Sequence, residues 1–203
     1  MNSLLDCMSE TSATVAIITE TWMRSQPELM GLVQDLSLGA GIGMVNRNRD
    51  PGERELAHGG VTVLRKETDC SLRNVDLKIP NPSGFEVLVA ARALQSHTRK
   101  LVVLACYIPP NYTRKKGNNA LNFVDDCMVE IKRRYKYPYI LVGGDFNQWR
   151  IDDCLADYAD IREALIGPTR GSRSIDRIFT NLSRTIKESG SLSPLETEGS
   201  NTQ

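Results

Sequence analysis

Acidic and amide side chains stand at the ends of apolar stretches in three separate parts of the chain. Glu20 ends the run VAIITE, Asp145 and Asn147 follow the run YILVGG, and Asp176 lies within the apolar segment SIDRIF. A carboxylate left alone at the end of a buried strand costs several kcal/mol unless a cation or hydrogen bonds compensate it. Such oxygen donors suit Mg²⁺ or Mn²⁺, which use one or two carboxylates together with waters and substrate phosphate.

Each of these side chains also has an ordinary structural interpretation. An Asp or Glu just after a strand is most often a turn residue or a helix N-cap, and each of the three carboxylates taken singly favours that interpretation. Gly143 and Gly144 change the balance for Asp145, because two glycines after a buried strand indicate close backbone approach at a site. Asp176 is harder to assign to a turn, since apolar residues flank it.

A tyrosine and two histidines complete the candidates. Tyr107 closes another apolar run and is followed by two prolines in CYIPPN; alone it would be interpreted as a buried tyrosine with a satisfied hydroxyl. His97 falls in a polar tip between two predicted strands, and His58 is best interpreted as a loop residue. We therefore expect neither histidine to be catalytic.

Positive charge is concentrated in three segments. Segment 111–119 follows the tyrosine and predicts a loop that rims the site, with three cations facing a polyanion: Arg114, Lys115 and Lys116. For Arg170 and Arg173, phosphate contact and a structural role are equally supported. The run KRRYK at 132–136 favours a solvated helix end, where cations interact favourably with the helix dipole.

The elements that must position these residues are mostly strands. Six short β-branched runs bounded by turn residues predict strands at Thr14–Thr19, Gly60–Lys66, Phe85–Leu94, Lys100–Ile108, Tyr139–Gly143 and Ser174–Thr180. The third and fourth runs flank the polar tip Gln95–Arg99, which predicts an antiparallel hairpin.

Three helices are predicted between the strands. Apolar residues at steps of three and four from Leu121 to Tyr135 predict a core-facing helix capped by Asn118 or Asn119. Weaker patterns predict a helix at Leu4, Leu5 and Met8 and a short helix at Ile161, Ala164 and Leu165. A hairpin with interspersed helices favours two packed sheets with helices outside.

Composition limits the classes of protein. The chain has 203 residues, with 25 Lys and Arg against 25 Asp and Glu, so net charge indicates no particular partner. Its apolar runs are too short to span a bilayer and no leader is recognised, so we expect no membrane contact and no secretion. Five scattered cysteines without a CxxC pair favour reduced thiols in an intracellular compartment, most of them in the core, and no zinc site.

Together, five segments resemble the endonuclease/exonuclease/phosphatase (DNase I-like) superfamily, and most of all the endonuclease domains of LINE-type (non-LTR) retrotransposons. They occur in the order of that family and span residues 15 to 182: TETW at 19–22, HGGVTVL at 58–64, CYIPP at 106–110, GGDFNQW at 143–149 and SIDRIFTN at 174–181.

This resemblance implies an α+β fold, a four-layer α/β/β/α sandwich of two mostly antiparallel sheets with the site at one end. It implies that Glu20 binds the catalytic metal, together with Asp145, and that Tyr107 contacts the scissile phosphate. Asp145 and Asn147 would position the attacking water and the phosphate. Asp176 corresponds to the residue that supports the family's catalytic histidine.

The sequence departs from the family pattern at both ends. The family's first strand, which carries an Asn, and its closing Ser-Asp-His motif have no counterpart here. We therefore expect one domain over residues 1–186 that lacks those two parts, a poorly ordered segment over 187–203, and impaired catalysis.

Two classes of function remain open from the sequence. The first is a Mg²⁺-dependent or Mn²⁺-dependent endonuclease that nicks DNA, acting as a monomer, in the nucleus if its substrate is genomic, with a reverse transcriptase domain in the parent polyprotein. The second is an inactive remnant that binds nucleic acid or protein. A phosphatase or lipid phosphodiesterase of the same fold is a further alternative.

Overall fold

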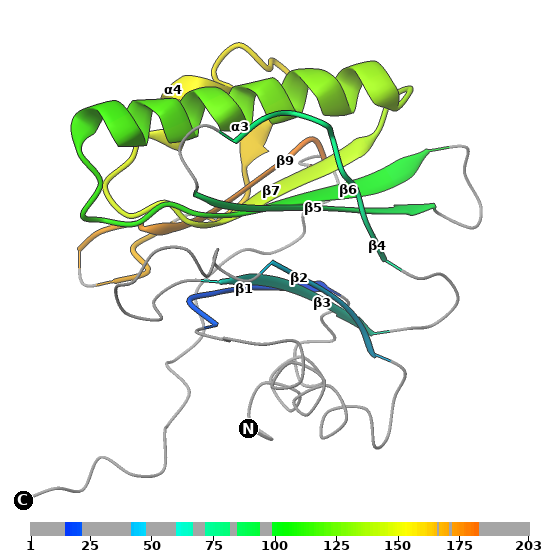
Figure 1. The fold of residues 1–203 in the computed structure, drawn as a ribbon, viewed down its shortest axis with the longest axis horizontal. Helices are drawn as coiled ribbons and strands as arrows, with labels where there is room; N and C mark the ends of the chain where they lie inside the picture. The colour runs from blue at the N-terminus through cyan, green and yellow to red at the C-terminus, as the bar shows by residue number, and fades with distance from the viewer. Residues whose placement is uncertain are drawn as a thin grey trace, which may run out of the picture.

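Two sheets face each other, and helices cover the outer face of the larger one (Figure 1). This computed structural model describes residues 15–21, 42–47, 60–66, 72–81, 85–93, 99–165, 167–170 and 172–182. The arrangement is the predicted α+β sandwich, with a helix layer and two sheet layers in the described residues. The helix expected at Leu4 to Met8, the segment 187–203 and both histidines lie outside those residues.

The smaller sheet has three antiparallel strands in the order β1-β3-β2, namely β1 (Val15–Thr19), β3 (Val61–Lys66) and β2 (Ile42–Arg47). Thr19 pairs with Val61, so the end of β1 lies beside the start of β3. Strand β2 was not predicted, because its few apolar residues follow a glycine-rich stretch that is typical of a loop.

The larger sheet has six strands in the order β4-β5-β6-β7-β9-β8. Its strands are β4 (Arg73–Asn74), β5 (Glu86–Ala93), β6 (Lys100–Tyr107), β7 (Tyr139–Asp145), β9 (Asp176–Thr180) and β8 (Arg162–Glu163). The predicted hairpin of β5 and β6 is confirmed as antiparallel. Strands β6 and β7 are parallel, so the chain must cross over between them.

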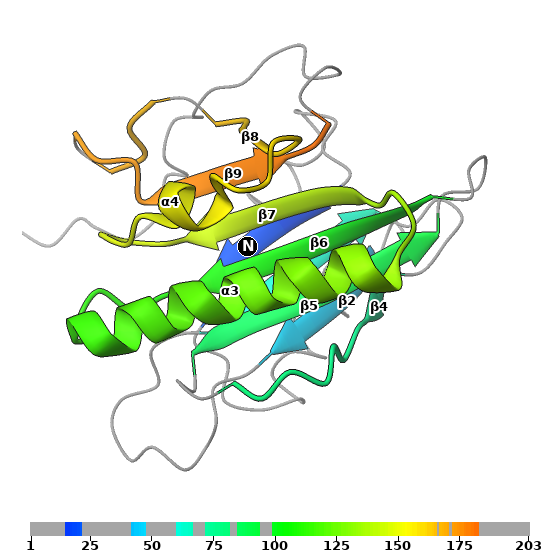
Figure 2. The ribbon, with the colours of Figure 1, turned by 90° about the horizontal axis from the view of Figure 1, so that it is seen from above.

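Helix α3 (Arg114–Arg134) makes this crossover and lies along β5 and β6 (Figure 2). The predicted cap at Asn118 or Asn119 is wrong. The helix begins earlier, with Thr113 as its N-cap, whose hydroxyl accepts a hydrogen bond from the Lys116 backbone N–H at 3.3 Å. The first turn of α3 is polar, and the apolar repeat that predicted the helix begins only at Leu121. The sequence therefore predicted a start that is too late.

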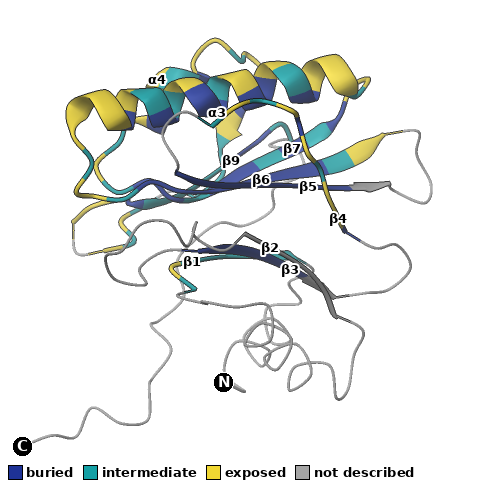
Figure 3. Ribbon diagram, viewed as in Figure 1, coloured by how far each residue is buried: buried dark blue, intermediate teal, exposed yellow. Residues whose placement is uncertain are grey.

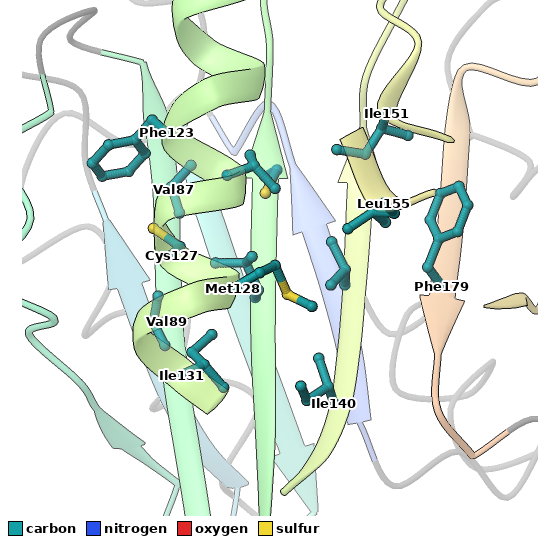
Figure 4. Packing of buried hydrophobic residues seen from close by; sticks show 14 of the residues in the cluster. Val87, Val89, Phe123, Cys127, Met128, Ile131, Ile140, Ile151, Leu155 and Phe179 are labelled. Carbon is teal, nitrogen blue, oxygen red and sulfur yellow. The ribbon is translucent and has the colours of Figure 1, made fainter. Parts of the chain in front are cut away.

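The main core lies between α3 and the larger sheet. Buried side chains of α3, such as Cys127, Met128 and Ile131, pack onto Val87 and Ile140 of the sheet (Figure 4). The exposed residues of α3 lie on the side away from the sheet (Figure 3). Burial of an amphipathic face is therefore what holds the helix in place.

A second core lies between the two sheets. It contains Val61 and Val63 of β3, Leu88 of β5, and Val103 and Tyr107 of β6. Side chains alternate along a strand, so Cys106 belongs to the helix-side core while its neighbour Tyr107 faces the smaller sheet. As predicted, the described cysteines are free thiols and mostly buried, namely Cys106, Cys127 and Cys154.

The predicted short helix at Ile161 to Leu165 is wrong. Arg162 and Glu163 form strand β8, which pairs with β9, and the helix of this region is α4 (Ile151–Leu155). Pairing with the edge of β9 satisfies backbone groups that a one-turn helix would leave open. None of the helices in the described part of the chain has the length and apolar content needed to cross a membrane.

A substitution of Gly144 tests how closely β6 and β7 approach each other. It has φ 142°, and a Cβ built on it would lie 1.9 Å from the Cys106 carbonyl oxygen. We expect Gly144→Ala to lower the free energy of unfolding by about 3 kcal/mol, because the clash is with backbone that cannot move away. Urea denaturation measures the change.

Gly167→Ala is the matched control, since Gly167 has φ 122° but nothing within 4 Å of the added Cβ. It carries the backbone strain alone, about 1 kcal/mol. Equal losses in the two variants would contradict the proposed clash.

Candidate active site

Four polar side chains stand in one row across the larger sheet. Strand pairing places Glu86 opposite Tyr107, Tyr107 opposite Asp145, and Asp145 opposite Asp176. Directly paired residues point to the same face of a sheet, and neighbouring strands lie about 4.8 Å apart, so the row spans about 14 Å. Because Tyr107 faces the smaller sheet, the row does too. These residues are called the strand-end row below.

Glu20 joins the row from the smaller sheet. It directly follows β1, and the Tyr107 hydroxyl donates a hydrogen bond to its Oε1 at 2.6 Å. Glu20 has φ 53°, a left-handed conformation that costs a residue other than glycine about 1 kcal/mol. The side chain itself is exposed. The predicted convergence of Glu20, Tyr107 and Asp145 is therefore present, although Glu20 is not buried as the sequence suggested.

Glu86 makes a second link between the sheets and was missed by the sequence interpretation. Its side chain is buried, and its Oε2 accepts a hydrogen bond from the Gly60 backbone N–H at 2.5 Å. Gly60 has φ 95°, and a Cβ there would lie 2.2 Å from the Thr21 hydroxyl. A signal existed in the sequence, because Glu86 interrupts an apolar strand between Phe85 and Val87.

The electrostatics of the row centre on Asp145. Burial raises the pKa of Asp145 to about 6, with further increases from the negative charges of Asp176 and Glu20, while the Asn147 backbone N–H and Arg170 act to lower it. Burial also raises the pKa of Tyr107, as does its hydrogen bond to Glu20. Tyr107 therefore remains a hydrogen-bond donor, and Asp145 ionises close to neutral pH.

Asn147 is held beside Asp145 by its own backbone conformation. It has φ 49°, its N–H donates to Asp145 Oδ1 at 2.8 Å, and its side-chain amide donates to the Ile108 carbonyl at 3.0 Å. Trp149 and Gln148, which follow, donate to the carbonyls of Pro109 and Pro110. These hydrogen bonds join the turn after β7 to the turn after β6.

The five cations expected around the site lie in two different elements. Arg170 lies close enough to lower the pKa of Asp145, and Arg173 is exposed in the same turn, paired with Arg170 in an isolated bridge. The predicted loop is wrong for the remaining three, which are exposed in the first turn of α3: Arg114, Lys115 and Lys116. That turn contains no acidic residue, although the positive end of the helix dipole disfavours cations there.

The donor set fits a hard divalent cation. The negative charges of Asp176 and Glu20 repel that of Asp145 and raise its pKa. A bound dication would offset this repulsion. In the described residues no three His, Cys, Asp or Glu side chains gather closely enough to enclose a metal on their own. Mg²⁺ does not require such a cage, since it binds through one or two carboxylates plus waters and substrate oxygens. Glu20 and Asp145 are the residues that would hold it.

No protein-family model and no curated protein sequence matches the chain. Solved structures do match its fold. An endonuclease/exonuclease/phosphatase family protein from Bacteroides thetaiotaomicron has a TM-score of 0.65 at 14% identity, covering 88% of this chain and 73% of its own.

Two further structures show the same similarity. A mannosyl-6-phosphatase, also from Bacteroides thetaiotaomicron, has a TM-score of 0.65 at 13% identity, covering 87% of this chain and 74% of its own. D. rerio TDP2, complexed with a single-strand DNA product, has a TM-score of 0.55 at 11% identity, covering 88% and 75%. The fold is therefore the DNase I-like fold of endonuclease/exonuclease/phosphatase structures.

Replacing Asp145 by Asn tests the electrostatics of the row through stability. The pKa of Asp145 is about 6 in the folded chain against 3.8 as the ordinary value. Folding therefore disfavours the ionised form, and the folded chain loses stability as pH rises from about 4 to 6. We expect Asp145→Asn to be about 1–2 kcal/mol more stable than the parent at pH 7.5 and nearly equal to it at pH 4.

Thermal unfolding at a series of pH values measures this difference. Asp126→Asn, at an exposed position of α3, is the control and should follow the parent at every pH. A stability difference for Asp145→Asn that does not depend on pH would contradict the assignment.

Proposed function

We propose that this chain is a metal-dependent phosphodiesterase that nicks DNA, an endonuclease of the retrotransposon type. The observation that carries the proposal is the strand-end row with Glu20 above it, in which hydrogen-bond donors and carboxylates converge where two sheets meet. Phosphodiester hydrolysis requires these groups: a proton acceptor for water, donors for the phosphoryl oxygens, and ligands for a cation.

Each residue has a role that its contacts support. Asp145, held by the Asn147 backbone N–H, takes a proton from the attacking water. Tyr107 stays protonated and orients Glu20 through its hydroxyl. The Asn147 side-chain amide donates one hydrogen to the Ile108 carbonyl and offers its second toward the phosphate. A divalent cation bound by Glu20 and Asp145 would neutralise charge that develops on the phosphoryl oxygens.

The positive charge at this end of the larger sheet favours a polyanionic substrate. Arg114, Lys115 and Lys116 occupy a helix start where cations are unfavourable unless an anion is near, and Arg170 lies close enough to Asp145 to lower its pKa. A DNA backbone supplies several phosphates at once, whereas a monoester supplies only one. A reverse transcriptase domain in the parent polyprotein, and action in the nucleus, belong to the same proposal.

Nicking of supercoiled plasmid DNA tests the function. We expect nicking with Mg²⁺ or Mn²⁺, none with EDTA, and a rate about 10²–10⁴-fold lower in Asp145→Ala, because that variant loses the base. Asp153→Ala is the control, since Asp153 is exposed and pairs only with Arg150 among the described residues.

The other outcomes distinguish the alternatives. Metal-dependent release of phosphate from a monoester without nicking would replace the endonuclease by a phosphatase. No metal-dependent hydrolysis of either substrate, with DNA binding retained, would replace it by an inactive binding module.

The Tyr107 hydroxyl can be tested against a matched tyrosine. Tyr158 also donates to a carboxylate, Asp125 Oδ1, at 2.5 Å, but lies on the helix side of the sheet. We expect Tyr107→Phe and Tyr158→Phe to lose similar stability, about 1 kcal/mol. Only Tyr107→Phe should slow nicking, by about tenfold or more, because Glu20 then loses its fixed orientation. Equal rates in the two variants would contradict the role of Tyr107.

A further inference from the structure

A pocket of about 420 Å³ opens at the opposite end of the larger sheet from the strand-end row. It lies where α3 ends and β7 begins, beside the start of β6 (Figure 2). The row is at the other end of β6, about 23 Å away along seven strand residues. Tyrosines and cations dominate the lining of this tyrosine pocket: Tyr135, Tyr137, Tyr139, Arg99, Lys132 and Lys136.

The charge of the tyrosine pocket is positive. Its acidic lining residue, Asp160, is bound by Lys132 at 2.7 Å. Arg99 stands 5.2 Å from the centre of the Tyr139 ring, and Lys136 stands 5.8 Å from that of Tyr137. In the part of the chain that the structure describes, neither of these two cations has a carboxylate partner. Their charge is therefore available to an anion that enters the pocket.

Tyr137 is held in an unfavourable position. Its side chain is 70% exposed, and its backbone has φ 51°, a left-handed conformation that a bulky residue seldom adopts. Glycine or asparagine would fit this turn without that strain. A large aromatic ring presented to solvent by a strained backbone indicates a contact that the chain alone does not satisfy.

We propose that the tyrosine pocket binds single-stranded nucleic acid, with a base stacked on Tyr137 and the adjoining phosphates against Arg99 and Lys136. Exposed aromatic rings interleaved with cations are the combination that single strands require, because an unpaired base offers its face for stacking. A paired base is already stacked within its duplex, so the pocket should prefer single strands. This inference goes beyond the proposed function and does not depend on cleavage.

Fluorescence anisotropy of a labelled dT12 oligonucleotide in EDTA tests the proposal without hydrolysis. We expect Tyr137→Ala to weaken binding about 5- to 100-fold, and Tyr137→Phe to bind as the parent does, because the ring is kept. Lys136→Ala should reduce the salt slope of log K by about 0.7, one phosphate contact. Arg133→Ala, at a cation bound by Glu130, is the control and should bind normally.

A further variant separates folding from binding. Tyr137→Gly relieves the left-handed backbone, so its thermal midpoint should equal or exceed that of the parent while its affinity for dT12 falls as in Tyr137→Ala.

Several outcomes would overturn the proposal. They are unchanged affinity in Tyr137→Ala, an equal loss in Arg133→Ala, tighter binding of duplex than of dT12, or binding to phosphatidylserine vesicles that depends on Tyr137 while dT12 binding does not. Plasmid nicking should be unaffected by Tyr137→Phe, so failure here and failure of the proposed endonuclease are separate results.

Discussion

The hydrogen bond from the Tyr107 hydroxyl to Glu20 joins the ends of strands that belong to different sheets. Strand pairing within the larger sheet is enough to place four polar residues in a row. Without the smaller sheet, however, that row would be exposed to solvent. Glu20 is placed above it only because β1 ends where β6 ends, and the Glu86 bond to Gly60 fixes a neighbouring point. The chemistry of the site thus depends on how the two sheets are packed at this edge.

Helix α3 gives the larger sheet two charged ends with different surroundings. It is 21 residues long, about 32 Å. Its first turn carries three exposed cations at the end of the larger sheet where β6 ends, and the helix dipole disfavours them there (Figure 2). At its last turn Arg133 and Arg134 are bound by Glu130. The cations Arg99, Lys132 and Lys136 line the tyrosine pocket beside that turn, in which only Tyr137 of the three tyrosines is exposed. The same crossover that makes β6 and β7 parallel therefore separates two positively charged surfaces across the domain.

Strand positions and the convergence of Glu20, Tyr107 and Asp145 could be predicted, because each strand is an apolar run that ends at a polar residue. The start of α3 could not, since Arg114–Gly117 is polar and its cap, Thr113, precedes any apolar repeat. Strand β8 has two residues and exists only because β9 offers an edge. Glu86 interrupts an apolar run much as Asp176 does. That it belongs to the strand-end row is known only from its pairing with Tyr107. Left-handed backbone at Glu20 and Asn147 is likewise a tertiary effect.

The separation of the bonded groups along the chain determines when the site forms. The β5–β6 hairpin and the β6–α3–β7 crossover close short loops, whereas Glu20 and Tyr107 are 87 residues apart and close a long one. Helix and larger sheet can assemble first and leave Glu86, Asp145 and Asp176 along an uncovered edge. Docking of β1 and β3 then completes the arrangement. Glu20 and the strand-end row therefore meet only when the two sheets have packed together, so the candidate site would be among the last parts of this fold to form.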